Sequence, residues 1–331
     1  MATPVEAQKI TYHPIKPWIS QKAVPILTFS FYIFAGLLAF SVYKDWIWLS
    51  VPLVLVVSHL MHGLLICFHE ATHCTMRKGR QAHEIDRTLI GISCWISFTL
   101  YRVTHQTHHM HLATEKDVEL WPFVDTNKPR WARRLAAFIE LNFGLFFTPF
   151  LFWRVFFMRD SPIRNKRVRR KIWLEGAATV VVWAIVVASV AHFGLWKYFW
   201  WCYFIPSFIA GNLQSWRKYI EHMGLEGNTP KSATRSIVAD TIPGKVVSLT
   251  LLHEPLHGIH HVKSSIPHGD LPQHVDKLTP EDDGDVRLFP HYRAALIHLI
   301  SKLRDPQVGG QWKQNETKKA QVEQPSLAGS V

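Results

Sequence analysis

Residues 46–73 read WIWLSVPLVLVVSHLMHGLLICFHEATH, an apolar run that passes directly into two histidines, His69 and His73. The part up to Phe68 holds no Asp, Glu, Lys or Arg, and about 20 such residues in a helix cross the hydrocarbon core of a bilayer. Positions i and i+4 of a helix lie on one face, so both imidazoles point the same way. The stretch therefore predicts a transmembrane helix that ends in a pair of candidate metal ligands.

Three further apolar segments have the length of a membrane span, at residues 24–43, 172–193 and 198–216. With 46–68 they form two hairpins joined by short polar turns. Hydrophobic residues make up 48% of the 331-residue chain and charged residues only 19%, and the apolar ones gather in these runs. We predict an all-α integral membrane protein with four transmembrane helices in two hairpins and a cytoplasmic helical cap that carries the histidines.

Two other apolar segments are too short or too polar to be assigned as spans. Residues 88–101 number only 14 and suit a re-entrant or interfacial helix. Residues 135–158 contain Glu140, Pro149 and Arg154 and suit a segment at the membrane surface. Whether either segment enters the bilayer stays open at this point.

Basic residues predict the orientation. Of the 37 Lys and Arg residues, only Lys44 and Lys197 lie in the two hairpin turns. Because cytoplasmic loops carry an excess of Lys and Arg, we expect both termini and both large polar regions on the cytoplasmic side, in a multi-pass protein of a bacterial plasma membrane. The basic run at 164–171 (RNKRVRRK) suits anionic headgroups, so the formal charge of +12 requires no nucleic acid partner.

These segments predict one membrane domain, residues 24–305, after a cytoplasmic segment at 1–23. That segment lacks the apolar core and small-residue cleavage site of a signal peptide, so the first span is expected to stay as an anchor. The tail, 306–331, is polar and rich in Gly and Gln, and we predict that it is disordered.

The histidines form three clusters. Two of them, at 105–109 and 257–261, share the pattern HxxHH, which can present three imidazoles from one helical turn. Eight histidines are too many for one tetrahedral zinc, and a site rich in imidazole without thiolates suits iron among the redox metals. The eight candidates are His69, His73, His105, His108, His109, His257, His260 and His261.

Other interpretations of these clusters have to be weighed. Residues 69–73 also match HExxH, so a zinc protease with Glu70 as general base is an alternative, although it leaves both HxxHH clusters without a role. Solvated or packing histidines could explain any one cluster but not three together. The four Cys have no CxxC spacing, which argues against a disulfide framework or a thiolate zinc site.

HEATH (69–73), HQTHH (105–109) and HGIHH (257–261), with apolar hairpins between them, resemble the membrane fatty acid desaturase and hydroxylase superfamily over roughly residues 24–275. The resemblance implies two ferrous ions (Fe²⁺), O2 as co-substrate and a separate electron-transfer protein of the ferredoxin, rubredoxin or cytochrome b5 type. It also implies a ninth ligand, His222 here. The surrounding KYIEHMGL is similar to the NYxEHYGL element of membrane alkane monooxygenases, with Lys218 in place of the Asn.

Other residues near the clusters could support the ligands. His253 and His111 could lie beside the metal site or in solvent, and His59 and His62 could line a substrate passage or only pack within the second span. Metal-bound histidines commonly donate their second N–H to a carboxylate. The candidate acceptors are Glu70, Glu115, Asp117, Glu221 and Glu254, for each of which a solvated role is equally open.

The resemblance predicts an oxygen-dependent oxidoreductase that acts on C–H bonds of a lipid, with a fatty acyl desaturase as first choice. Alkane or fatty acid hydroxylation, carotenoid ketolation or hydroxylation, and fatty acid decarboxylation are alternatives on the same scaffold. A membrane metal-binding or transport protein is the alternative from another class. It would scatter histidines through several spans, whereas these concentrate at one end.

Overall fold

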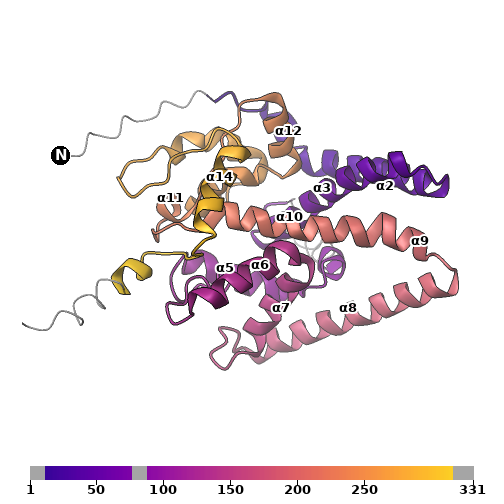
Figure 1. Cartoon of the computed structure of the whole chain (residues 1–331), viewed down its shortest axis with the longest axis horizontal. Coiled ribbons are helices and arrows are strands. Elements are labelled where there is room, and N and C mark those ends of the chain that lie inside the picture. The colour runs from indigo at the N-terminus through magenta and orange to yellow at the C-terminus, as the bar shows by residue number, and fades with distance from the viewer. Residues whose placement is uncertain (1–11, 77–87, 316–331) are drawn as a thin grey trace, which may run out of the picture.

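A computed structural model of the chain describes residues 12–76 and 88–315. Within these ranges the fold is helical, and the β-type pairing there is an isolated bridge between Ile237 and Phe289. The predicted all-α class is thus confirmed. Long helices form a bundle at one end, and shorter helices form a cap at the other (Figure 1).

Three helices are long and apolar enough to cross a membrane: α2 (Ala23–Tyr43), α3 (Ile47–Thr72) and α8 (Lys166–His192). Only 17% of the apolar window of α2 and 6% of that of α8 are buried, as expected for helices that face lipid. In α3 the buried share is 56%. α3 is therefore the central helix of the bundle, and it delivers the first histidine pair to the cap.

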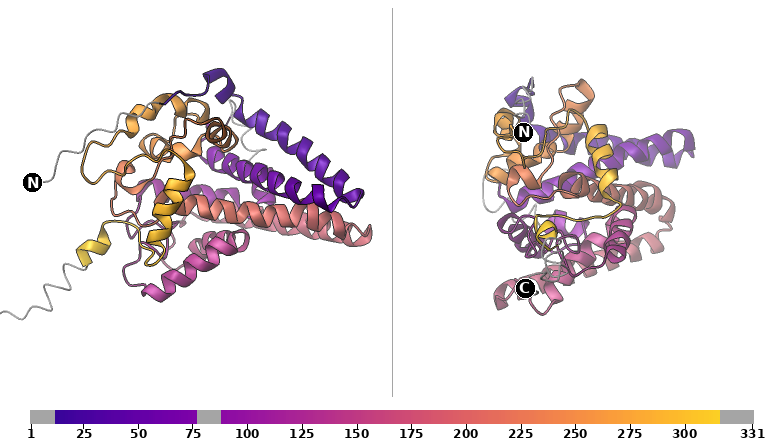
Figure 2. Two further views of the ribbon diagram at one scale, coloured as in Figure 1. Left: turned by 45° about the horizontal axis from the view of Figure 1, so that its top comes forward. Right: turned by 60° about the vertical axis from the view of Figure 1, so that its left-hand side comes forward.

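The fourth predicted span, 198–216, is not a single long apolar α-helix. The chain passes from α9 (Trp196–Tyr198) through a π-helical stretch, η1 (Phe199–Phe204), into α10 (Ile205–His222). The end of α10 is polar and buried in the cap. α10 packs against α3 and α7 and runs alongside the bundle in two views (Figures 1 and 2). Length and composition thus mark three spans, and the fourth stays a prediction.

The two hairpin turns meet at the end of the bundle that lies away from the cap. Asp45, between α2 and α3, forms an ion pair with Lys197, which follows α8. Asp45 and Gly194 have positive φ, the left-handed conformation that a tight turn between two helices uses. This contact places the two hairpins side by side and leaves the opposite end for the histidines.

Residues 88–101 and 135–158, which the sequence did not assign as spans, lie at the junction of bundle and cap. Residues 88–93 are helical, and after a turn they lead into α5 (Phe98–Met110). The second segment, 135–158, is divided between two helices, α6 (Arg130–Asn142) and α7 (Gly144–Phe157). α7 approaches α10 so closely that a Cβ on Gly144 would lie 2.5 Å from the carbonyl oxygen of Gly211.

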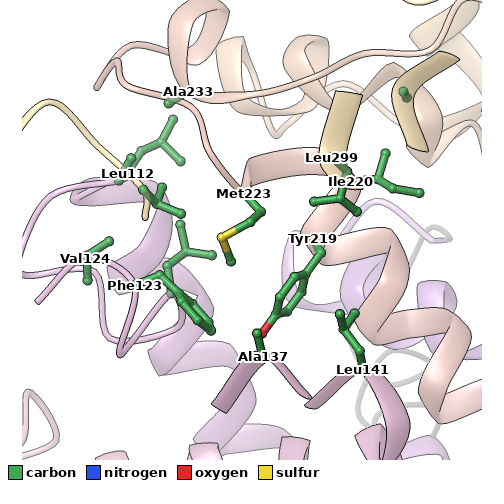
Figure 3. Close-up of a cluster of buried hydrophobic side chains, with 14 of the residues drawn as sticks. Leu112, Phe123, Val124, Ala137, Leu141, Tyr219, Ile220, Met223, Ala233 and Leu299 are labelled. Carbon is green, nitrogen blue, oxygen red and sulfur yellow. The ribbon is translucent and has the colours of Figure 1, made fainter. Parts of the chain in front are cut away.

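The cap is a set of short helices packed on several apolar clusters, one of which is a core around Met223. They are α1 (Pro17–Ser20), α11 (Pro230–Ala233), α12 (Ile242–Thr250), η2 (Glu254–Leu256), α13 (His257–Val262), η3 (His268–Leu278) and α14 (Tyr292–Lys302). In the core, Met223 lies between Phe123 and Tyr219, with Leu141 of α6 and Leu299 of α14 nearby (Figure 3). This core joins the end of α10 to the loop at 111–129.

The predicted disordered tail needs a correction at its start. Val308 is fully buried, and its N–H donates to the carbonyl of Phe123 at 3.0 Å. The indole N–H of Trp312 donates to the same carbonyl at 2.8 Å. Polar composition misled the prediction, because two apolar side chains and a few backbone bonds are enough to fix this segment on the cap. Residues 316–331 and, at the amino end, 1–11 lie outside the described residues.

Candidate metal centre

The nine histidines proposed as ligands come together where the bundle meets the cap. α3 ends in the first pair, α5 and α13 carry the two HxxHH motifs, and α10 ends at His222. They form two adjacent groups. The five-histidine cluster consists of His69, His73, His105, His109 and His260. The four-histidine cluster consists of His108, His222, His257 and His261.

In the five-histidine cluster the ring nitrogens converge. Nε2 of His105 lies 3.1 Å from Nε2 of His73 and 3.0 Å from Nε2 of His109, which is 3.1 Å from Nε2 of His260. Two nitrogens that bind one ion at about 2.1 Å and at right angles are about 3.0 Å apart. The spacing therefore fits donors around a common metal ion.

The four-histidine cluster has the same spacing. Nε2 of His257 lies 2.9 Å from Nε2 of His222 and 3.0 Å from Nε2 of His261. The ring of His108 lies 5.0 Å, between centroids, from the rings of both His222 and His261. The two clusters adjoin, since the rings of His109 and His261 stack at 4.4 Å.

Each HxxHH motif supplies both clusters, whereas its spacing alone predicted three imidazoles from one helical turn. His105 and His109 join the five-histidine cluster, whereas His108 joins the other. With 3.6 residues per turn, position i+3 lies about 60° to one side of position i, and i+4 about 40° to the other. The motif therefore divides its imidazoles between two directions. In the other motif, His260 likewise joins the five-histidine cluster, whereas His257 and His261 join the four-histidine cluster.

Carboxylates and a carbonyl orient several rings through Nδ1. Nδ1 of His108 donates to Asp117 at 2.7 Å, Nδ1 of His105 donates to Glu119 at 3.0 Å, and Nδ1 of His257 donates to Glu254 at 2.9 Å. Nδ1 of His222 donates to the carbonyl of Ala233 at 3.0 Å. A proton on Nδ1 leaves the Nε2 lone pair free to face the cluster.

Of the five candidate acceptors, Asp117 and Glu254 thus accept hydrogen bonds from histidines of the clusters. Glu221 accepts from Arg217, and Glu70 accepts from the hydroxyl of Thr75. Glu115 accepts from Thr126 at the surface and contacts no histidine of either cluster.

Two functional residues were missed. Glu119 stands two positions after Asp117 in the acidic loop that follows the second histidine motif, and that proximity could have marked it. Arg217 stands one turn before Glu221 on α10, which is the signal for an ion pair within a helix.

The four other histidines considered from the sequence, His59, His62, His111 and His253, lie outside both clusters. His253 is fully buried, with Nδ1 3.0 Å from the hydroxyl of Ser248. His59 pairs with Thr250 of α12 at 2.7 Å, and His62 is buried within α3. His111 caps the end of α5. None of the four belongs to a group of convergent donors among the described residues.

Burial keeps most of the nine imidazoles of the two clusters neutral. Burial and neighbouring histidines lower the pKa of His73 to about 3 and hold the pKa of His105, His260 and His261 well below the ordinary value. Burial also acts on His108, but the Asp117 carboxylate outweighs it and raises the pKa of His108. Neutral imidazole is the form that binds metals.

The acidic side chains around the clusters suit bound cations. Five carboxylates lie in or beside the clusters, against a single guanidinium, that of Arg217. They are Glu70, Asp117, Glu119, Glu221 and Glu254. This excess of acidic side chains in a buried site favours bound cations. In addition, both ring nitrogens of His69 are buried without a hydrogen-bond partner, which suits a metal ligand.

Comparison with known protein families agrees with this geometry. The model of a family described as fatty acid desaturase matches residues 46–293, a range that includes all nine histidines of the two clusters. No curated protein matches the chain.

Proposed function

The chain belongs to the fatty acid desaturase family, and we propose that it oxidises C–H bonds of a lipid acyl chain with oxygen at two ferrous ions, as a desaturase. One observation carries the proposal: nine imidazoles converge as adjacent groups of five and four. A zinc protease would use three protein ligands and keep one position open. Here the HExxH histidines share their cluster with three more, so that alternative lacks support.

The protein's own part is to hold and shield the metals. The nine histidines would bind the ions, and Asp117, Glu119 and Glu254 fix ring orientation through Nδ1. When bound, the two irons supply the reduction of O2 and the removal of hydrogen from an unactivated C–H bond. Six of the nine side chains are buried and the other three are half-buried, so bulk water is largely kept away.

We place the histidines on the cytoplasmic side of a four-span protein. The support is the contact between the two hairpin turns at the far end, together with the scarcity of basic residues in those turns. α9, η1 and α10 then form the fourth span. Both termini and the cap face the cytoplasm, where a separate electron-transfer protein of the ferredoxin, rubredoxin or cytochrome b5 type would deliver electrons.

Hydroxylation is the second candidate. It is favoured by residues 218–225, KYIEHMGL, which are similar to the element of membrane alkane monooxygenases. The two reactions share the site and differ in the product, because a second hydrogen abstraction gives a double bond and oxygen transfer gives an alcohol.

The test is expression with a suitable reductase system and mass spectrometry of the host lipids. Lipids that lose two hydrogens indicate a desaturase, and lipids that gain one oxygen indicate a hydroxylase. His108→Ala should abolish either product, because it removes a ligand from the four-histidine cluster. Purified protein that holds zinc and no iron after anaerobic iron loading would contradict the proposal.

A further inference from the structure

One buried carboxylate, Glu254, lies between the two histidine clusters. It is fully buried at the start of η2, directly before α13. Its Oε1 is 2.9 Å from Nδ1 of His257, in the four-histidine cluster. Its Oε2 is 3.4 Å from Nδ1 of His69, in the five-histidine cluster. Each oxygen of Glu254 thus faces an imidazole of a different cluster.

The contact between Nδ1 of His69 and Oε2 of Glu254 joins a buried nitrogen and a buried oxygen that have no nearer hydrogen-bonding partner. Nδ1 of His69 and Oε2 of Glu254 are both buried, and neither has a hydrogen-bond partner among the described residues. Oε1 of Glu70 is farther from Nδ1 of His69, at 3.6 Å, and the other oxygen of Glu70 accepts from Thr75. Buried polar atoms are nearly always paired, so Glu254 is the acceptor that His69 would use.

Arg217 of α10 fixes this carboxylate. Its Nη1 lies 2.8 Å from Oε1 of Glu254 and 2.6 and 2.7 Å from the two oxygens of Glu221. The three side chains are buried, and a guanidinium keeps its charge in such a place. The position of Glu254 is therefore set by α10 as well as by its own segment.

The backbone before Glu254 is also held in an uncommon conformation. Leu252 has φ 52° and His253 has φ 60°, both in the left-handed region that residues other than glycine seldom adopt. Such a conformation persists only where the surrounding structure enforces it. Two neighbouring residues, Leu252 and His253, therefore adopt an energetically unfavourable backbone conformation directly before the Glu254 carboxylate.

We propose that Glu254, clamped by Arg217, is a positioning residue shared by the two metal sites, which orients one ligand in each and so links the affinities of both ions. The inference rests on the proposed function, since it requires a metal ion in each cluster. Other orienting carboxylates serve one cluster each: Asp117 contacts only His108 among the nine, and Glu119 contacts only His105.

The test compares carboxylate variants by titration with ⁵⁷Fe²⁺ under anaerobic conditions, with Mössbauer signals for the two ions. Asp117→Asn and Glu119→Gln identify the signals of the four- and five-histidine clusters, because each should weaken its own ion. Glu254→Gln should weaken both ions, each by about 10–100-fold in affinity. Gln keeps the size of the side chain, and Arg217 keeps Glu221 as its ionic partner, so no buried charge is stranded.

Two further variants separate this role from general effects. Glu254→Asp keeps the charge but shortens the reach, so it too should weaken both ions. Glu140→Gln is the matched control: Glu140 is buried and paired with Lys218 of α10, but it contacts no histidine of either cluster. It should leave both affinities at the wild-type value.

The failure of this inference differs from the failure of the proposed function. Wild-type protein with two ions, combined with loss of a single signal or of none in Glu254→Gln, overturns the shared role alone. Full affinity in Glu254→Asp also overturns it, since charge would then suffice without reach. Wild-type protein that binds no pair of ferrous ions contradicts both the inference and the proposed function.

Discussion

Glu175 is a carboxylate in the third turn of α8, and its replacement by Gln should destabilise the attachment of α5 to the bundle. Glu175 accepts three hydrogen bonds at the first turn of α5: from the hydroxyl of Ser97 at 2.6 Å, and from the N–H and hydroxyl of Thr99 at 2.9 and 2.6 Å. The N–H of Thr99 lies in the helix turn that has no intrahelical acceptors. The carboxylate thus anchors the helix that carries His105, His108 and His109.

The expected cost follows from these contacts. Gln keeps one acceptor oxygen but replaces the other by an NH2 group, which cannot accept, so at least one of the three bonds to a carboxylate oxygen is lost and the charge is removed from the others. A hydrogen bond to a charged group contributes about 1.5–3 kcal/mol. The negative charge at the start of a helix adds about 0.3–1 kcal/mol. We expect a loss of about 2–3 kcal/mol, or a Tm lower by roughly 4–8 °C.

The assay is thermal unfolding in detergent, followed by circular dichroism, with metal content measured on the same samples. Glu226→Gln is the control, because Glu226 is exposed and its ion pair with Lys313 is of the surface kind that contributes about 0–1 kcal/mol. If the Tm of Glu175→Gln equals that of Glu226→Gln, the anchoring role assigned to this carboxylate is wrong.

Two further predictions concern the cap. Deletion of residues 305–331 should reduce the iron retained per chain, because Val308 and Trp312 bind the loop that carries Asp117 and Glu119. Deletion of residues 316–331 is the control and should leave the iron content unchanged. Equal iron content in the two truncated proteins would refute this prediction. Burial, Arg235 and Lys302 lower the pKa of His298, whose neutral Nδ1 accepts from Nε of Arg235 at 2.8 Å. The unfolded chain therefore takes up this proton at higher pH than the folded chain, so stability should be full above about pH 6.5 and fall as pH drops below it. His298→Gln, which still accepts from Arg235, should flatten this dependence of Tm on pH, and an unchanged slope would contradict the assignment.

Much of the candidate site could be predicted from the sequence, because the spacing of histidines and the length of apolar runs are local features. The spacing of His105, His108 and His109 sets their directions on one helix, whatever the rest of the chain does. The length of each apolar run sets whether it can span a bilayer, and three of the four predicted spans correspond to long apolar helices. The family followed from the order of the three histidine motifs, and the family match confirms it.

Local signals failed where a feature depends on distant partners. The tail at 306–315 has no pattern of its own, and it is ordered because it binds the carbonyls of a loop almost 190 residues earlier. The predicted fourth span contains η1 near its start, and the polar end of α10 is accommodated because the cap surrounds it.

The sequence by itself determined which nine imidazoles are available and from which helices they come. Only the tertiary structure decided how they divide into five and four, and that Glu254 and Arg217 lie between the two groups. The physical reason is that helical periodicity fixes the direction of a side chain about its own axis. Which partner it meets depends on how α3, α5, α10 and α13 dock, and docking is set by contacts between residues far apart in the chain.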